Sequence, residues 1–164
     1  MGDLKMPKPY LYFAAPLFSQ AEKEFNCHVR DLLSPYFDVF LPQEDGALIV
    51  DLLRAGLTPD TAKRYVFKND IDAIKRADVL LIILDGRSID EGASFELGFA
   101  YAKGKNCIGL QTDARRLLPI GNNPMIDEAV ERIFSTVGEL LHWAREYAEG
   151  TERKSPISIH PTGA

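Results

Sequence analysis

The chain has 164 residues, of which 46% are hydrophobic and 26% are charged, and its formal net charge is −5. This length and composition predict one globular domain over residues 1–149, followed by a polar tail over residues 150–164. The negative charge gives no electrostatic basis for nucleic-acid binding. No apolar run approaches the ~20 residues that cross a bilayer, so we expect no membrane partner.

The thiols and imidazoles are too scattered to predict a disulfide or a metal site. Cys27 and Cys107 lie far apart in the sequence and are expected to be reduced core thiols of a cytoplasmic protein. The three histidines, His28, His142 and His160, lack the spacing of a zinc site. No Gly-x-Gly-x-x-Gly follows the first predicted strand and no Walker lysine motif occurs, so we expect no dinucleotide or triphosphate and no cofactor.

Five short apolar segments are predicted to be strands. They cover residues 10–15, 37–41, 79–84, 107–111 and 132–135. The segments lack the alternation of apolar and polar residues that a half-exposed strand shows. They therefore indicate a parallel sheet that is covered on both faces.

Helical segments alternate with these strands. They are predicted at residues 20–33, 47–55, 59–77, 92–103 and 137–149. Ser19 and Glu22 form a capping-box pattern, Thr58 suits an N-cap, and residues 43–46 and 112–124 are predicted loops. With right-handed crossovers, this order predicts a three-layer α/β sandwich with a central parallel sheet of about five strands, either flavodoxin-like or Rossmann-like.

Glu96 is the first candidate for chemistry. It lies on the helix that follows the strand at residues 79–84, where open α/β sheets form their ligand crevice. The positions three and four residues away hold small or apolar side chains, namely Gly92, Ala93, Phe99 and Ala100. Such surroundings are atypical of a solvated surface carboxylate. The structural alternative is that Asp90 only caps the helix and Glu96 has a buried partner.

Asp70 is the second candidate. Its neighbours three and four residues away along the predicted helix are all apolar, namely Val66, Phe67, Ala73 and Ile74. Asp72 is surrounded instead by lysine, arginine and asparagine, so we expect it to be a solvated charge. A carboxyl group in an apolar stripe destabilises the fold unless it has a partner or a function.

Four motifs in order along the chain carry a family resemblance. They are Tyr12-Phe-Ala-Ala-Pro-Leu-Phe-Ser19, Asn69-Asp70, Asp90-x-Gly-x-x-x-Glu96-Leu-Gly and Asn123-x-Met125. Together they resemble the nucleoside 2-deoxyribosyltransferase family over about residues 10–134. The resemblance implies an enzyme that moves a 2-deoxyribosyl group from one nucleobase to another by double displacement. Its substrates would be 2'-deoxynucleosides and free purine or pyrimidine bases.

The resemblance also implies roles for three catalytic candidates. Glu96 matches the nucleophile that forms a glycosyl-enzyme ester, and Asp70 matches the residue that handles the proton of the leaving and incoming base. Tyr12 matches a hydroxyl that orients the nucleophile. Independently, the residues suit this chemistry, because a carboxylate can capture an oxocarbenium-like centre and a protonated carboxyl can protonate the departing base. We expect Glu96 to remain ionised and the pKa of Asp70 to be raised.

Further residues are candidates for substrate binding. Asp90 matches a carboxylate that binds the sugar hydroxyls, and Gly92 belongs to the same motif. Asn123 and Met125 match residues that the family contributes to a neighbouring subunit's site, which implies a homo-oligomer. Gln43, just after the second predicted strand, could bind a base through its amide.

Structural explanations exist for several of these residues. Tyr12 could be a core aromatic, Asp90 a simple N-cap, and Asn123 part of a turn before Pro124. Three other functions also remain open. They are hydrolysis of 2'-deoxynucleoside 5'-monophosphates, the phosphoribohydrolase type with its Gly-rich loop, and a non-catalytic nucleoside-binding module. The anionic Asp90 favours a free 5'-hydroxyl over a phosphate in the substrate.

Overall fold

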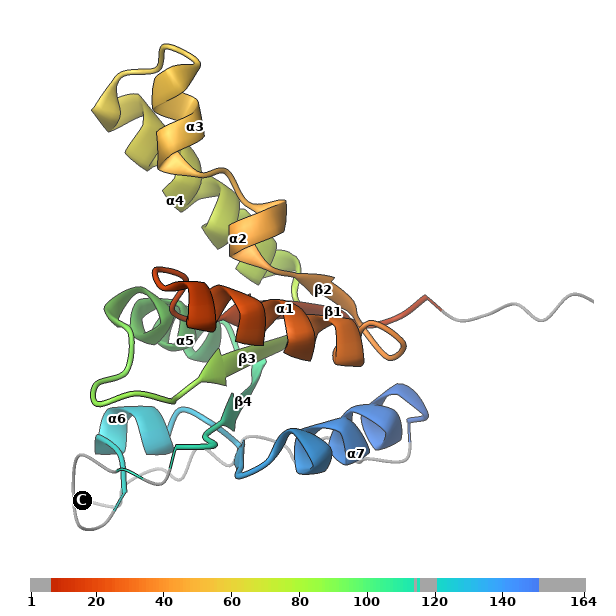
Figure 1. Ribbon diagram of the computed structural model, residues 1–164. Coiled ribbons are helices and arrows are strands. Elements are labelled where there is room, and N and C mark those ends of the chain that lie inside the picture. Colours follow the sequence, from red (N-terminus) through yellow and green to blue (C-terminus); the bar gives the residue numbers. More distant parts are fainter. Residues whose placement is uncertain (1–6, 114, 116–120, 151–164) are drawn as a thin grey trace, which may run out of the picture.

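The central sheet has five parallel strands. The computed structural model describes residues 7–113, 115 and 121–150. Its strands are β1 (Tyr10–Ala14), β2 (Asp38–Phe40), β3 (Val79–Ile83), β4 (Asn106–Leu110) and β5 (Arg132–Phe134). Their order across the sheet is β2-β1-β3-β4-β5, and every pair of neighbours is parallel (Figure 1). This order is the flavodoxin-like one, so the predicted α/β class is confirmed and the Rossmann-like strand order is not found.

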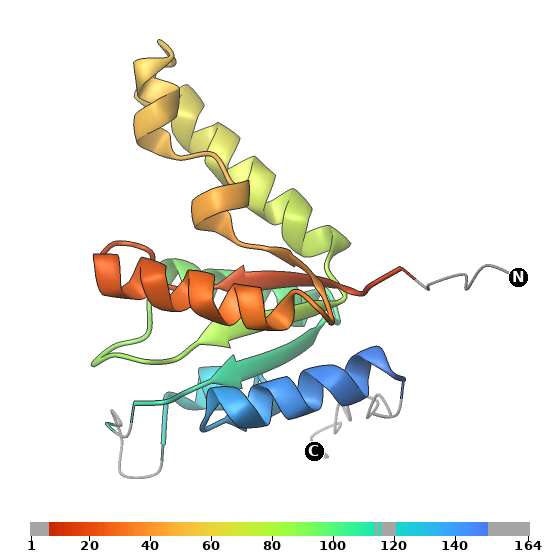
Figure 2. The same ribbon diagram turned by 45° about the vertical axis from the view of Figure 1, so that its right-hand side comes forward.

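Helices cover both faces of the sheet. They are α1 (Gln20–Leu33), α2 (Pro42–Asp45), α3 (Ile49–Arg54), α4 (Pro59–Arg76), α5 (Glu91–Ala102), α6 (Pro124–Asp127) and α7 (Val137–Ala148). Figure 2 shows α1 and α7 on one face, with α5 and the end of α4 behind the other. These positions complete the three-layer sandwich.

Each layer boundary has its own apolar core because successive strand residues point to opposite faces. Leu11 and Phe13 of β1 pack with the buried residues of α1 and α7. Tyr12 and Ala14 pack instead with the residues of α4 and α5. All five residues of β3 are buried, as expected for the central strand of a sheet covered on both faces.

Side-chain caps begin the longer helices where the sequence predicts them. The Ser19 hydroxyl accepts a hydrogen bond from the Glu22 backbone N–H, and the Glu22 carboxylate accepts one from the Ser19 N–H at 2.7 Å. Thr58 caps α4, and Asp90 caps α5. These caps satisfy backbone donors that have no partner inside the helix.

Two short helices occupy segments that the sequence predicts to be loops. Residues 43–45 lie in α2, which starts at Pro42. The Asp45 carboxylate accepts a hydrogen bond of 2.7 Å from the backbone N–H of Leu41, the residue before this helix. At the end of the predicted loop 112–124, Pro124 begins α6. A helix of one turn is too short to produce a periodic apolar pattern, so residue periodicity could not reveal either one.

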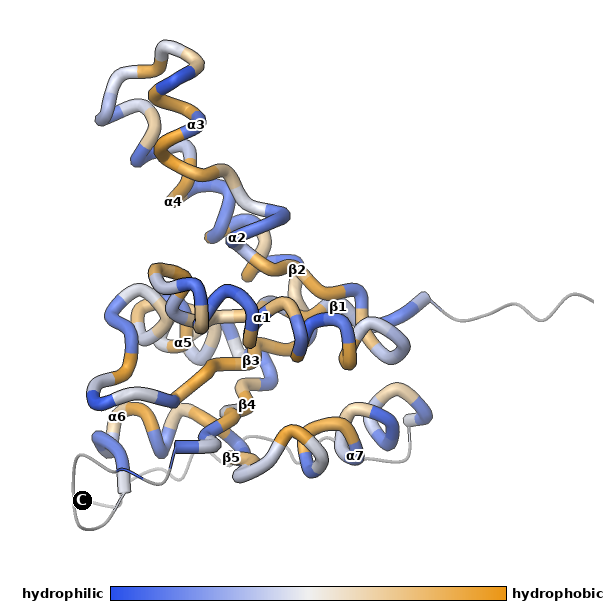
Figure 3. Tube along the Cα trace, in the orientation of Figure 1, coloured by the Kyte–Doolittle hydropathy of each residue, from blue (hydrophilic) through white to orange (hydrophobic). Residues whose placement is uncertain are grey.

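A helical arm extends away from the sheet. We define it as α3 together with the first half of α4, residues 59–67, and it projects beyond the body in both Figure 1 and Figure 2. No residue of α3 is buried, although Figure 3 shows that this helix is largely apolar. At the base of the arm, Leu48, Ile49 and Val50 are exposed large hydrophobic residues that line a groove.

The predicted tail lies outside the described residues except for Gly150, as do residues 1–6 and most of residues 114–120. Among the helices of the described part, none is both long and apolar enough to cross a membrane.

Candidate active site

Tyr12 and Glu96 meet at the carboxyl end of the sheet. The Tyr12 hydroxyl donates a hydrogen bond of 2.6 Å to Glu96 Oε1, joining residues that are 84 positions apart. Tyr12 is 0% exposed, and its ring stacks on Phe40 of β2 with ring centroids 5.5 Å apart. β1 and β3 are the strands between which the chain order reverses, and this reversal is where flavodoxin-like folds bind their ligands.

Burial sets the ionisation of this pair. Desolvation raises the pKa of Glu96 from 4.5 to about 8, and the charges of Asp70 and Asp90 add to the increase. The hydrogen bond from Tyr12 lowers that pKa and offsets part of the effect. Burial also raises the pKa of Tyr12 far above its usual value, so its hydroxyl remains a donor. The expectation that Glu96 is ionised at neutral pH is therefore wrong, because desolvation outweighs the hydrogen bond.

Asp70 lies in the groove at the base of the helical arm. The groove has a volume of about 410 Å³, and its wall is mainly apolar, with Leu17, Leu48 and Val66 among its lining residues. Burial raises the pKa of Asp70 from 3.8 to about 6, which confirms the predicted direction. Its charge also raises the pKa values of Glu96 and Tyr12, so the three groups belong to one electrostatic cluster.

Asp72 differs from Asp70 as expected. Its carboxylate accepts hydrogen bonds from Lys68 at 2.5 Å and Lys75 at 3.1 Å. These contacts lower the pKa of Asp72. Two aspartates one residue apart on α4 are thus placed in opposite environments.

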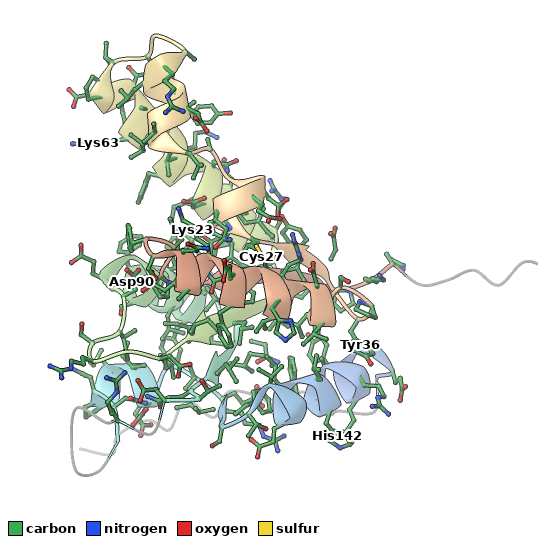
Figure 4. The ribbon with its side chains drawn as sticks, viewed as in Figure 1. Lys23, Cys27, Tyr36, Lys63, Asp90 and His142 are labelled. Carbon is green, nitrogen blue, oxygen red and sulfur yellow. The ribbon has the colours of Figure 1, made fainter. Side chains whose placement is uncertain are left out.

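Asp90 and Gly92 lie at the first turn of α5. Asp90 Oδ1 accepts a hydrogen bond of 2.8 Å from the Ala93 N–H, so the carboxylate caps the helix. Figure 4 shows Asp90 at the connection between β3 and α5. A Cβ atom on Gly92 would lie 3.1 Å from this same oxygen. Glycine therefore leaves space beside the Asp90 carboxylate.

The side-chain amide of Gln43 forms hydrogen bonds with residues of α1. Its Oε1 accepts from Asn26 Nδ2 at 2.9 Å, and its Nε2 donates to the carbonyl of Lys23 at 3.1 Å. Figure 4 places Lys23 and Cys27 on the side of α1 that faces α2. Asn26 is 2% exposed and also donates to the Pro16 carbonyl at 2.8 Å, so it ties the segment after β1 to Gln43. Sequence reasoning missed Asn26; the signal was a polar residue within the apolar stripe of α1.

Asn123 and Met125 lie on a different side of α5 from Glu96. They line a second cavity of about 330 Å³, together with Ser94 and the segment from Gly86 to Ile89. Asn123 Oδ1 accepts from the Met125 N–H at 2.9 Å and caps α6, while Met125 is 80% exposed. Glu96 and Asp70 do not line this cavity, so one chain does not bring all the candidates together.

No group of three or more histidine, cysteine or acidic side chains in the described ranges is arranged to hold a metal ion. The described cluster instead offers two carboxyl groups of raised pKa and a phenol, at the ligand-binding end of a parallel sheet.

Comparison with known families agrees with this arrangement. The family model described as nucleoside 2-deoxyribosyltransferase matches residues 11–150. The chain belongs to this family. The match begins within β1 and extends through α7, so it includes both carboxyl groups, Tyr12 and the residues that line both cavities.

Solved structures share the fold of this deoxyribosyltransferase-family protein. A conserved protein from Enterococcus faecalis V583 is 27% identical with a TM-score of 0.71, over 85% of this chain and 99% of that one. A 2-deoxyribosyltransferase from Bacillus psychrosaccharolyticus is 24% identical with a TM-score of 0.67, over 80% and 90% of the two chains. A CMP N-glycosidase from Clostridium botulinum is 21% identical with a TM-score of 0.53, over 84% and 98%. Among curated proteins, none matches the sequence significantly.

Proposed function

We propose that the protein transfers the 2-deoxyribosyl group between the nucleobases of 2'-deoxynucleosides, through a covalent ester on Glu96. The observation that carries the proposal is the Tyr12–Glu96 hydrogen bond of 2.6 Å at the carboxyl end of the sheet, in a chain of the nucleoside 2-deoxyribosyltransferase family. A fixed carboxylate beside the sugar can capture the anomeric carbon as the glycosidic bond breaks.

The first half of the reaction uses both carboxyl groups. A Glu96 oxygen bonds to C1' of the sugar, and the bonding electrons of the C1'–N bond leave with the base. The Asp70 carboxyl gives its proton to the departing base. In the second half, a nitrogen of another base bonds to C1', the ester C–O bond breaks, and Asp70 takes the proton of the incoming base. Tyr12 holds Glu96 in position throughout.

The pKa values support this division of roles only when the two carboxyls are treated as a pair. With pKa values of about 8 for Glu96 and about 6 for Asp70, the pair carries one proton between these limits. The reactive form has that proton on Asp70 and the charge on Glu96. Substrate binding therefore has to place the shared proton on Asp70.

The rate of transfer is therefore expected to show a bell-shaped dependence on pH. Below about 6 both carboxyls are protonated and Glu96 cannot attack; above about 8 both are ionised and the base departs without a proton. Initial rates between pH 4.5 and pH 9.5 would test this, with a maximum at about 7 and a fall of about tenfold per pH unit outside the limits. A rate that stays constant to pH 9.5 would contradict the role of Asp70 as the acid.

Replacing Tyr12 by phenylalanine is expected to lower kcat by about 10- to 100-fold, because one hydrogen bond that orients a charged group is lost. The ring would still stack on Phe40. Since this hydrogen bond lowers the pKa of Glu96, the pKa should rise further in Tyr12→Phe and shift the pH profile upward. Tyr10→Phe, at the first residue of β1, is the matched control and should keep the wild-type rate.

We further propose that Asn123 and Met125 complete the site of a second copy of the chain. The exposure of Met125 and the distinct cavity that both residues line support this. Glu96→Gln protein mixed with an Asn123→Ala, Met125→Ala variant would then regain up to about a quarter of the wild-type rate, because hybrid dimers hold one intact site. No recovery after subunit exchange would place both residues in their own chain's site.

The central test is incubation of the protein with 2'-deoxyinosine and adenine, with the products separated by chromatography. Formation of 2'-deoxyadenosine would establish base exchange. Release of hypoxanthine and free sugar alone would identify a hydrolase, and 2'-deoxynucleoside 5'-monophosphates would be the next substrates. Tight nucleoside binding without any product would identify a binding module.

A further inference from the structure

A buried polar network forms part of the wall of the cavity that Asn123 and Met125 line. Gln111, which follows β4, is 4% exposed, and Asn122 is 6% exposed. Their amides pair reciprocally: Gln111 Nε2 donates to Asn122 Oδ1 at 2.9 Å, and Asn122 Nδ2 donates to Gln111 Oε1 at 2.9 Å. Two amides in this arrangement fix each other's orientation, because each donor faces an acceptor.

Asp127 extends the network to α6. Its Oδ1 accepts from Asn122 Nδ2 at 2.9 Å, and its Oδ2 accepts from the Asn122 backbone N–H at 3.1 Å. Gly121 is in the left-handed region with φ +133, and a Cβ there would lie 2.9 Å from Asp127 Oδ2. The carboxylate therefore lies against the turn that leads into Asn123, at a position whose backbone conformation favours glycine.

The network holds an element that has almost no apolar support. No residue of α6 is buried, and Ile126 is the member of this helix that packs against the apolar core, from its edge. Asn123 uses Oδ1 to accept the Met125 N–H, so its Nδ2 group is the part of the side chain available to donate to a ligand. The direction in which Asn123 Nδ2 points depends on the conformation of the turn formed by residues 121–123.

We propose that Gln111, Asn122 and Asp127 are positioning residues that direct Asn123 and Met125 toward the sugar of the bound nucleoside. This inference rests on the proposed function, in which Asn123 and Met125 contact substrate. A pair of leucines could fill the same volume, but it would not fix the direction of the turn. A hydrogen-bonded pair of amides fills this volume and also fixes the direction of the turn, because hydrogen bonds are directional.

Asp127→Asn is the sharpest test, because it keeps the shape of the side chain. One end of the new amide is a donor, so it opposes either the Asn122 side-chain amide or the Asn122 backbone N–H, and one hydrogen bond is lost. We expect KM for 2'-deoxyinosine to rise about tenfold while kcat stays within about twofold, as for a misplaced binding contact. Asn106→Ala, at the opposite end of β4, is the control, because its buried Oδ1 has no partner within the described residues.

A double-mutant cycle separates positioning from general stability. In an Asn123→Ala, Met125→Ala background, Asp127→Asn should raise KM by less than about twofold, because the residues through which it acts are gone. An equal rise in both backgrounds would overturn the proposal. So would a fall in kcat and Tm with KM unchanged, since that result marks a structural role alone.

A readout independent of turnover distinguishes failure of this inference from failure of the proposed function. By NMR, Asp127→Asn should increase amide hydrogen exchange at Met125 and shift the Met125 methyl signal, relative to wild type and Asn106→Ala. If wild type turns over no nucleoside but these changes occur, the proposed function fails and the positioning role remains. Unchanged Met125 signals would overturn the positioning role whatever the activity.

Discussion

Glu96→Gln is expected to lower kcat for deoxyribosyl transfer by at least about a thousandfold while the fold is retained. Glutamine keeps the size of the side chain and an oxygen that can accept the Tyr12 hydrogen bond. Its amide cannot form the ester that carries the sugar between bases. Mass spectrometry offers a direct check, because wild type incubated with a 2'-deoxynucleoside and no acceptor should gain the mass of a deoxyribosyl unit, and the variant should not.

The same substitution is expected to raise stability at alkaline pH. Burial raises the pKa of Glu96 from 4.5 in its usual environment to about 8, so the folded protein binds this proton more tightly than the unfolded chain does. The resulting stability is fully present below about 4.5 and is lost as the pH rises through 8. Glutamine cannot ionise, so the Tm of Glu96→Gln should exceed that of wild type at pH 9 by more than it does at pH 4.5.

Glu91→Gln is the matched control for both measurements. Glu91 begins the same helix but is exposed. It should keep the wild-type turnover, and its Tm should change little with pH relative to wild type. If Glu96→Gln retained most of its turnover, a covalent ester on this residue would be excluded, and a role in binding or orientation would have to replace it.

Strand positions followed from the sequence, but the order of the strands did not. The apolar runs predicted each strand end to within one residue, because β1, β3 and β4 are almost wholly buried and the short edge strands β2 and β5 each end in a buried phenylalanine. Right-handed crossovers restrict the handedness of each connection, but they do not decide which strand becomes the neighbour of β1. The flavodoxin-like order depends on how α1 and α7 pack together on one face, and these helices are separated by most of the chain.

The candidate site was predictable where the information is local. The apolar neighbours of Asp70 lie on its own helix, so the rise in its pKa could be anticipated. The raised pKa of Glu96 could not be anticipated, because it depends on burial by the folded chain and on Tyr12 of β1 and Asp70 of α4, which a helical net of α5 omits. Gln111 and Asn122 were missed although they lie only 11 positions apart, because one ends a predicted strand and the other lies in a predicted loop, and neither shows a periodic pattern that pairs them.

Asp70→Asn is expected to lower the rate with 2'-deoxyinosine by about 10²- to 10³-fold, because the departing base loses its proton donor. The amide matches the carboxyl in size and can occupy the same groove. The loss should depend on the base. With 7-methyl-2'-deoxyguanosine the base already carries a positive charge and leaves as a neutral molecule, so release of this base should proceed at nearly the wild-type rate.

Asp72→Asn provides the control for this comparison. Asp72 lies two residues further along α4 and pairs with Lys68 and Lys75 at the surface, so its substitution should leave both rates unchanged. The pH profile gives a second readout: Asp70→Asn should lose the fall in rate that wild type shows when its acid becomes ionised. An equal loss with both nucleosides would assign Asp70 to substrate binding, since a proton donor matters only for a base that needs the proton.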